Sequence, residues 1–314
     1  MVMSKLFLKD FQLQKTKPKN NFVLCLQAVR VFSLTASVVP VFIGAAIAFA
    51  GKEDIFWGLF PLVLFCSMMF QIGTNMVNDY YDFKKGIDTN DSCGGSRCLV
   101  DGLLRPAQML TGGLGAFALG ILGGFVLIYF RGWPILLLGV VGFAGGLCYT
   151  AKPISYKYFA LGDAAVFILM GPLMVIGSYF CLAGYYDNSV LLISIPVGFL
   201  VTAILQANNA RDINHDSLIG VKTVALLLGL HRAKICYVSL LVGAYLAVMV
   251  MVLTGVLGWW ALIVFASLPL AVKNIKTICR CSDSCPESIV GLDVMTAKLH
   301  LAFGVLLMGG ILLG

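Results

Sequence analysis

Residues 55–82 read IFWGLFPLVLFCSMMFQIGTNMVNDYYD, an apolar stretch that ends directly in a group of acids. Residues 55–77 carry no charged side chain, and a helix that crosses a bilayer needs about 20 mainly apolar residues. A second such stretch, residues 189–208, runs into the sequence NNARDINHD at 208–216. Both repeat the unit Asn-x-x-x-Asp. Because carboxylates at the edge of a bilayer are unfavourable unless they bind something, we expect two membrane spans that each present an acidic binding group.

With 60% hydrophobic residues, 12% charged residues and a mean hydropathy of +0.94, the 314-residue chain is too apolar for a soluble globular protein. We expect an all-α, multi-pass membrane protein that forms one integral-membrane domain over residues 1–314. Nine stretches have the length of a transmembrane helix: 31–50, 55–77, 108–130, 133–150, 160–183, 189–208, 234–254, 258–272 and 296–313.

The basic residues are distributed unevenly among the connections between these nine stretches. Of the 22 Lys and Arg residues, only Lys52 and Arg131 fall on one side of the predicted membrane, which leaves 20 on the other. The positive-inside rule therefore predicts a cell-membrane protein with both acid groups and the N-terminus in the cytoplasm and the C-terminus outside. Residues 1–29 form the cytoplasmic tail, either as an interfacial helix or as a frayed segment. The net charge of +7 favours membrane lipids and other anionic ligands rather than nucleic acid.

Small residues and prolines within the spans predict close contacts and bends. One span carries a small-residue stripe at four-residue spacing, which permits close approach of a neighbouring helix; the stripe comprises Gly112, Ala116, Gly120 and Gly124. Prolines inside spans are expected to kink their helices and to open a cavity, or to be tolerated without consequence; they are Pro40, Pro61, Pro172, Pro196 and Pro269.

Three cysteines near the C-terminal end, Cys279, Cys281 and Cys285, have no assigned role. They fall on the predicted cytoplasmic side, where the reducing environment disfavours disulfides. Their Cys-x-Cys-x-x-x-Cys spacing matches no established zinc pattern, although metal binding stays open.

The acid groups have the composition of a site for hard divalent cations. Two sets share a helix face if each span continues helically past its apolar residues: Asn75, Asn78, Asp79 and Asp82 in the first, and Asn208, Asp212 and Asp216 in the second. Mg²⁺ prefers oxygen ligands and binds through one or two carboxylates together with substrate phosphates. Two such faces opposite each other are therefore suited to ions that hold a diphosphate.

Basic residues on the same side could neutralise a departing diphosphate. The candidates are Arg97, Lys152, Lys157, Arg211 and Lys222. For any single one of them, a role only in setting membrane topology is an equal alternative.

The two acid motifs resemble those of the UbiA-type intramembrane prenyltransferases, and the resemblance extends from Arg30 to the end of the chain. The sequence NDYYDFKKGID at 78–88 is similar to the 1,4-dihydroxy-2-naphthoate polyprenyltransferase branch, in which the later acid follows a Gly-containing insert. The sequences LGD at 161–163 and GVKT at 220–223 also fit this branch. The stretch GGSRCLVDG at 94–102 replaces the Gly-Pro-x-Arg sequence of many such enzymes, which leaves the acceptor open.

The resemblance implies nine helices around a central cavity with a cytoplasmic polar cap. It also implies Mg²⁺-dependent transfer of a polyprenyl chain from polyprenyl diphosphate to an aromatic acceptor, as in menaquinone biosynthesis. The implied metal ligands are Asp79, Asp82, Asp88, Asp212 and Asp216; the implied substrate-binding residues are Asn78, Arg97, Lys152, Lys157, Asp163, Asn208 and Arg211. Among these, Asp82, Asp212 and Asp216 are expected to act in catalysis, together with Lys222 and Tyr149.

Two of these residues have equally good alternative roles, and two other classes of protein remain open. Tyr149 shields an allylic cation or merely packs, and Asp163 orients the acceptor or caps a helix. A transporter also uses buried acids, but usually near the membrane midplane. A CDP-alcohol phosphotransferase uses clustered aspartates, but its Asp-Gly-x-x-Ala-Arg motif is absent. Within the resembled family, 4-hydroxybenzoate or a lipid glycerol phosphate are alternative acceptors.

Overall fold

The computed structural model describes residues 20–51, 54–90, 92, 94–282 and 285–314. The described part is a bundle of helices with two isolated bridge pairs, which confirms the all-α expectation. The helices are α2 (Asn21–Ala28), α3 (Thr35–Ala50), α4 (Phe60–Lys84), α5 (Pro106–Arg131), α6 (Trp133–Cys148), α7 (Gly162–Ile168), α8 (Met174–Ala183), α9 (Asn188–Arg211), α10 (Ile213–Ile219), α11 (Val224–Leu253), α12 (Leu268–Cys279) and α13 (Leu292–Leu313). Residues 1–19 of the predicted tail lie outside the described residues.

Within the described residues, eight helical segments are long and apolar enough to cross a membrane. They are Val31–Ala50, Trp57–Lys84, Pro106–Arg131, Gly162–Ala183, Asn188–Arg211, Val224–Leu253, Trp259–Cys279 and Pro286–Leu313. The remaining predicted stretch, 133–150, corresponds to α6, an apolar helix of 16 residues that is shorter than a typical span. The multi-pass architecture is confirmed, whereas the count of nine is not.

The prolines have different effects according to their position in each helix. Pro40 and Pro196 lie inside α3 and α9, and Pro172 lies in a π-helical turn, Leu169–Leu173, between α7 and α8. Pro61 and Pro269 instead stand in the first turns of α4 and α12, so the expectation of kinks at these two positions was wrong. A first-turn amide has no partner within the helix, and proline is tolerated there.

The two acid-bearing helices end differently. Helix α4 continues through Lys84, so its Asn and Asp side chains share one face as expected. Helix α9 ends at Arg211, and α10 begins after Asp212. The backbone N–H groups of Asp212 and Asp216 still donate to residues four positions earlier, at 3.0 and 2.8 Å. The regular helix is nevertheless interrupted at Asp212, so the expected helical continuation of this span through its acids is not observed.

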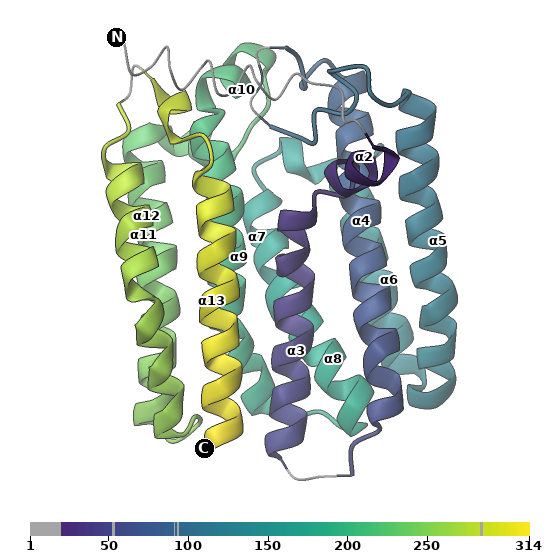
Figure 1. The fold of residues 1–314 in the computed structure, drawn as a ribbon, viewed down its shortest axis with the longest axis vertical. Coiled ribbons are helices and arrows are strands. Elements are labelled where there is room, and N and C mark those ends of the chain that lie inside the picture. The colour runs from purple at the N-terminus through teal and green to yellow at the C-terminus, as the bar shows by residue number, and fades with distance from the viewer. Residues whose placement is uncertain (1–19, 52–53, 91, 93, 283–284) are drawn as a thin grey trace.

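Glycines allow the helices to approach one another closely. A Cβ atom at Gly112 would lie 2.5 Å from the Met76 side chain, and one at Gly120 would lie 2.5 Å from Phe70. Part of the predicted small-residue stripe thus packs α5 against α4. Figure 1 shows the long helices running roughly alongside one another, with α10 and α2 near the upper end of the bundle.

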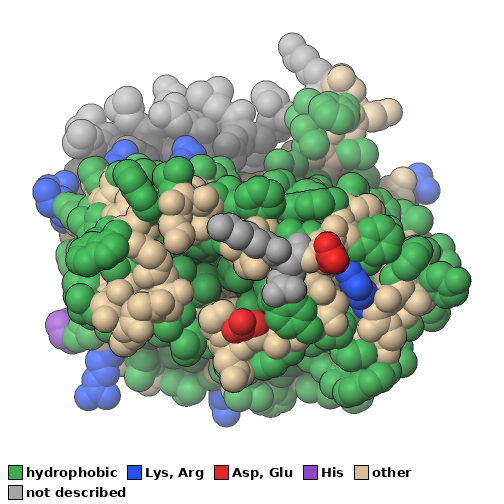
Figure 2. Space-filling view, turned by 90° about the horizontal axis from the view of Figure 1, so that it is seen from below, with side chains coloured by type: hydrophobic (Ala, Val, Ile, Leu, Met, Phe, Trp, Pro, Cys, Tyr) green, Lys and Arg blue, Asp and Glu red, His purple; other side chains and the backbone are tan. Residues whose placement is uncertain are grey.

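The lower end of the bundle in Figure 1, which is the face shown in Figure 2, is mainly apolar, with few acidic or basic side chains. Aromatic side chains at the lower ends of the helices are strongly exposed: Tyr129 is 83%, Trp133 is 72% and Trp259 is 77% exposed. Aromatic residues are enriched where a membrane meets water. The charged Arg131 is held here by the backbone carbonyls of Cys181 and Leu182, at 2.7 and 2.8 Å.

Candidate active site

A polar cavity of about 290 Å³ lies at the upper end of the bundle, where both acid motifs are found. Helices α4, α9 and α10 contribute to its walls, together with the loop that follows α4 and the end of α6. Four of the five predicted metal-binding acids line this cavity: Asp82, Asp88, Asp212 and Asp216. The structure therefore brings together acids from two motifs that are far apart in the sequence.

Asp82 is bound from the opposite wall by residues of the loop between α6 and α7. Its two carboxylate oxygens accept hydrogen bonds from Lys157 Nζ and from the Tyr158 hydroxyl, both at 2.6 Å. Lys157 also donates to Asn78 Oδ1 at 3.0 Å. Burial disfavours the charged form of Lys157, but the adjacent Asp82 outweighs this effect and raises the lysine pKa. Lys157 thus stays an ammonium group inside the cavity.

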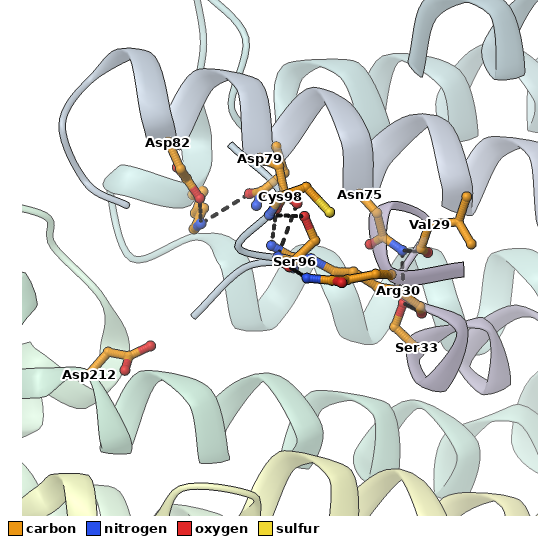
Figure 3. Close-up of polar contacts among 12 residues, drawn as sticks. Val29, Arg30, Ser33, Asn75, Asp79, Asp82, Ser96, Cys98 and Asp212 are labelled. Carbon is orange, nitrogen blue, oxygen red and sulfur yellow. Dashed lines mark hydrogen bonds and ion pairs between the residues drawn. The ribbon is translucent and has the colours of Figure 1, made fainter. Parts of the chain in front are cut away.

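Asp79 has a different environment from the other acids. One carboxylate oxygen forms an ion pair with Arg30, and the other accepts a hydrogen bond from the backbone N–H of Ser96 at 3.1 Å (Figure 3). Asp79 is 2% exposed and does not line the cavity. Its carboxylate anchors Arg30 and the loop that contains Ser96, so its predicted role as a metal ligand gains no support from its position.

The second acid motif is organised around the buried Arg211. Its guanidinium donates to both carboxylate oxygens of Asp212, at 2.7 and 2.6 Å, and to Asp293 Oδ2 at 3.3 Å. Close by, Asn209 Nδ2 donates to Asp163 Oδ1 at 3.1 Å. A small cleft contacts Asp163 together with Tyr149, so Asp163 faces the region beside the main cavity. The guanidinium of Arg211 therefore donates hydrogen bonds to acids of the protein itself, and it orients the Asp212 carboxylate.

The loop after α4 passes between the two acid groups. A Cβ atom on Gly94 would lie 3.4 Å from Asp212 Oδ2, and one on Gly95 would lie 2.8 Å from Asp88 Oδ2. Gly95 also has a φ of +74°, a conformation that favours glycine. The glycine pair thus permits this loop to approach carboxylates of both motifs, and Figure 3 shows Asp212 across the site from Asp79 and Asp82.

In two of the cavity acids, Asp88 and Asp216, burial and neighbouring carboxylates outweigh the effect of nearby cations on the pKa. Burial, reinforced by Asp82 and Asp79, raises the pKa of Asp88 to about 7. Burial, reinforced by Asp212, also raises the pKa of Asp216 to about 7. Excess negative charge on hard oxygen ligands fits divalent cations. Among the described residues no three His, Cys, Asp or Glu side chains gather around one point, so Mg²⁺ held here would need further oxygen ligands.

The remaining predicted residues divide into those at the cavity and those outside it. Asn208 and Tyr149 line the cavity, and burial raises the pKa of Tyr149 to about 12, so that its phenol stays neutral. Arg97 instead binds Ser92 and Asp101 within its own loop.

Two predicted lysines also lie away from the cavity. Lys152 and Lys222 are exposed, and neither lines it. The backbone of Lys222 pairs with the segment at 158–160, with its carbonyl accepting from the Ala160 N–H at 2.8 Å. Lys222 therefore contributes to the architecture of the site through its main chain.

Sequence reasoning assigned no role to four polar residues that the structure places at the site: Arg30, Tyr158, Asp293 and His215. Arg30 immediately precedes the first apolar stretch, and Asp293 is an acid close to the start of the last one. Such charges at membrane edges are a general indication of function. Tyr158 and His215 offered no comparable signal.

An apolar cavity of about 360 Å³ adjoins the polar one, between α4, α5, α6 and α8. The two cavities share five lining residues: Gln71, Thr74, Gly146, Leu169 and Met170. Leu169 and Met170 belong to the π-helical turn, a feature that is frequent at functional sites. One continuous site thus has a charged end and an apolar end.

Apolar helices long enough to cross a membrane thus surround a charged cavity and an adjoining apolar cavity, an architecture that fits a membrane-embedded enzyme. The chain belongs to the UbiA prenyltransferase family, whose model matches residues 37–284, and it is therefore a prenyltransferase. The expected family membership is thus confirmed, and the transporter and CDP-alcohol phosphotransferase alternatives are set aside.

Two relatives and two solved structures illustrate the family. The chain is 35% identical over 288 residues to 1,4-dihydroxy-2-naphthoate octaprenyltransferase of Bacillus subtilis (strain 168), covering 91% of each. It is 32% identical over 289 residues to UbiA prenyltransferase domain-containing protein 1 of Homo sapiens, covering 91% of this chain and 82% of that protein.

The solved structures share the fold at low sequence identity. A UbiA homolog from Aeropyrum pernix K1 has a TM-score of 0.66 at 15% identity, with 89% of this chain and 97% of that chain covered. A UbiA homolog from Archaeoglobus fulgidus bound to GPP and Mg²⁺ has a TM-score of 0.58 at 15% identity, with 91% and 99% covered.

Proposed function

We propose that this protein transfers a polyprenyl chain from polyprenyl diphosphate to 1,4-dihydroxy-2-naphthoate, with Mg²⁺ as cofactor. The observation that carries this proposal is the junction of a charged cavity with an apolar one. A polyprenyl diphosphate has the same two-part chemistry, with an anionic head and a hydrocarbon tail. Its head would lie among the acids and cations, and its tail would lie along the apolar wall.

The residues of the charged cavity would bind the diphosphate and stabilise its departure. Asp82, Asp88, Asp212 and Asp216 offer carboxylate oxygens for Mg²⁺, which would neutralise charge on the leaving diphosphate when bound. Lys157 is positioned to donate to diphosphate oxygens in exchange for part of its contact with Asp82.

Transfer requires that the allylic carbon–oxygen bond breaks and that the acceptor ring carbon bearing the carboxylate supplies the electrons of the new carbon–carbon bond. The diphosphate leaves with the electron pair of the broken bond. The acceptor then loses its carboxylate as carbon dioxide, and the electrons left behind restore the aromatic ring. Tyr149, which lines the cavity with a neutral phenol, would face the allylic cation and help to exclude water.

The acceptor assignment is supported by the relative from Bacillus subtilis and by the Gly-containing insert before Asp88. Asp163, held by Asn209 beside Tyr149, would orient this acceptor. We further propose that the acid-bearing end and the N-terminus face the cytoplasm, because the basic residues concentrate on that side.

Purified protein with Mg²⁺, a labelled polyprenyl diphosphate and 1,4-dihydroxy-2-naphthoate should give a decarboxylated, prenylated quinol and one carbon dioxide per turnover. Matched reactions contain 4-hydroxybenzoate or a lipid glycerol phosphate in place of this acceptor. Equal or faster prenylation of either one would overturn the acceptor assignment and leave the prenyltransferase activity standing.

A further inference from the structure

The wall of the apolar cavity is unusually rich in glycine. Six glycines from three helices line it: Gly120 and Gly124 of α5, Gly139, Gly142 and Gly146 of α6, and Gly177 of α8. Glycine destabilises a helix interior relative to alanine. Each position therefore requires a reason in packing or in ligand binding.

Two of these glycines are explained by helix packing. A Cβ atom at Gly120 would lie 2.5 Å from the Phe70 ring, and one at Gly146 would lie 2.4 Å from Thr74 Oγ1. Any side chain here would collide with α4. These positions hold α5 and α6 close to α4, as small residues commonly do in membrane bundles.

The other four glycines are not explained by a close approach of a neighbouring helix. A Cβ atom at Gly124 or Gly139 would meet no atom of the described residues within 4 Å. At Gly142 and Gly177 the nearest atoms, from Leu173 and Leu138, would lie at 3.5 and 3.7 Å, which is ordinary contact. A Cβ atom at any of these four positions on the cavity wall would displace no neighbour. Packing against other helices therefore does not explain these glycines.

Gly124 and Gly139 lie at the same depth on adjacent helices. Gly124 lies seven residues before Arg131, which ends α5. Gly139 lies six residues after Trp133, which begins α6. At a rise of 1.5 Å per residue, both lie about 10 Å above the turn between these helices. The junction with the polar cavity is at Gly146, a further ~10 Å along α6.

We propose that Gly124 and Gly139 determine which donor chain lengths the enzyme accepts, by leaving the deep part of the apolar cavity open. This assignment rests on the proposed function. The first isoprene units of any donor would lie near Gly146, where the two cavities meet, whereas only a longer chain extends past Gly139. A side chain at Gly124 or Gly139 would exclude long chains and leave short ones unaffected.

The test compares geranyl diphosphate with octaprenyl diphosphate as donors for the wild type, Gly139→Leu and Gly124→Leu. Gly115→Leu is the matched control, because Gly115 lies on α5 outside the cavity and a Cβ atom there also meets nothing within 4 Å. We expect the ratio of kcat/KM for the octaprenyl donor to that for the geranyl donor to fall at least ~10-fold in the two cavity variants, in line with the effect of overfilling a packed site. The geranyl rate and the Gly115→Leu ratio should stay within about twofold of wild type.

Normal geranyl turnover shows that a cavity variant is folded, and Gly139→Ala, with only one added carbon, should give a smaller change in the ratio. An unchanged ratio in both leucine variants, or an equal loss with both donors, would overturn the chain-length assignment while the transferase function stands. Absence of transfer from either donor by the wild type would overturn the proposed function and this inference together.

Discussion

His215 Nε2 lies 2.7 Å from the backbone carbonyl oxygen of Ile87, a residue 128 positions earlier in the sequence. Because a carbonyl oxygen only accepts hydrogen bonds, the contact requires a proton on Nε2. It joins α10, which carries Asp216, to the turn that carries Asp88. The two acid motifs are thus connected directly, and their separation across the cavity depends in part on this contact.

Replacing His215 by Ala should raise the Mg²⁺ concentration needed for half-maximal rate by ~5-fold, about the effect of losing one net hydrogen bond. His215→Gln, which keeps a donor, should recover most of this loss. Titration of the initial rate with Mg²⁺ measures the effect at saturating donor. An identical Mg²⁺ dependence in wild type and His215→Ala would show that the contact does not position the acids.

Asp82→Asn and Asp212→Asn should each lower turnover by at least ~100-fold at saturating Mg²⁺, because an amide binds this ion weakly. Asp187→Asn is the matched control, since Asp187 caps α9 at the opposite end of the bundle and asparagine caps equally well. Steady-state rates in detergent or vesicles provide the measurement. Near-normal turnover in either cavity variant would contradict a metal site at these carboxylates.

Removing the charge of Arg30 should destabilise the protein, because the buried Asp79 would lose the cation of its ion pair and keep only the hydrogen bond from the Ser96 N–H. We expect Arg30→Met to lower the free energy of unfolding by about 3 kcal/mol, the range observed when a buried ion pair loses one member. The double variant Arg30→Met/Asp79→Asn should recover much of that loss, since it leaves no unpaired charge. Thermal denaturation of the purified variants measures these changes in stability. If the destabilisation by the two substitutions is simply additive in the double variant, Arg30 and Asp79 do not interact energetically.

Mg²⁺ binding should weaken as the pH falls through neutrality. The pKa of both Asp88 and Asp216 is raised to about 7 without the metal, so each carboxyl retains its proton until the pH approaches that value. Mg²⁺ binds the deprotonated form and must displace protons at pH 6 but few at pH 8. The half-saturating Mg²⁺ concentration, measured at both values, should therefore be higher at pH 6. This difference should shrink in Asp88→Asn, and a pH-independent value in the wild type would contradict the titration of these acids.

The orientation in the membrane is testable by thiol labelling. Asn188 and Asn214 are exposed at opposite ends of the bundle. In a background without other accessible cysteines, Asn188→Cys should react with an impermeant reagent applied to intact cells, whereas Asn214→Cys should react only after permeabilisation. The reverse pattern would contradict the orientation inferred from the basic residues.

Apolar runs and residue spacing along the chain were sufficient to predict much of the fold. Apolar runs predicted most of the helical spans, because a segment in lipid must satisfy its backbone hydrogen bonds internally. Spacing also predicted that Asn78 and Asp82 share a face, since α4 continues as a regular helix. The prediction of kinks was wrong at Pro61 and Pro269. At both positions the α-helix begins later than the apolar run, so the proline lies in its first turn.

The sequence by itself determined the membrane class, the family and the two acid motifs, because each of these depends on residues close together in the chain. Only the tertiary structure decided the partners of the acids. Asp79 forms an ion pair with Arg30, whereas Asp82 accepts hydrogen bonds from Lys157 and Tyr158. These contacts join segments separated by dozens of residues, and helix packing rather than local spacing brings them together.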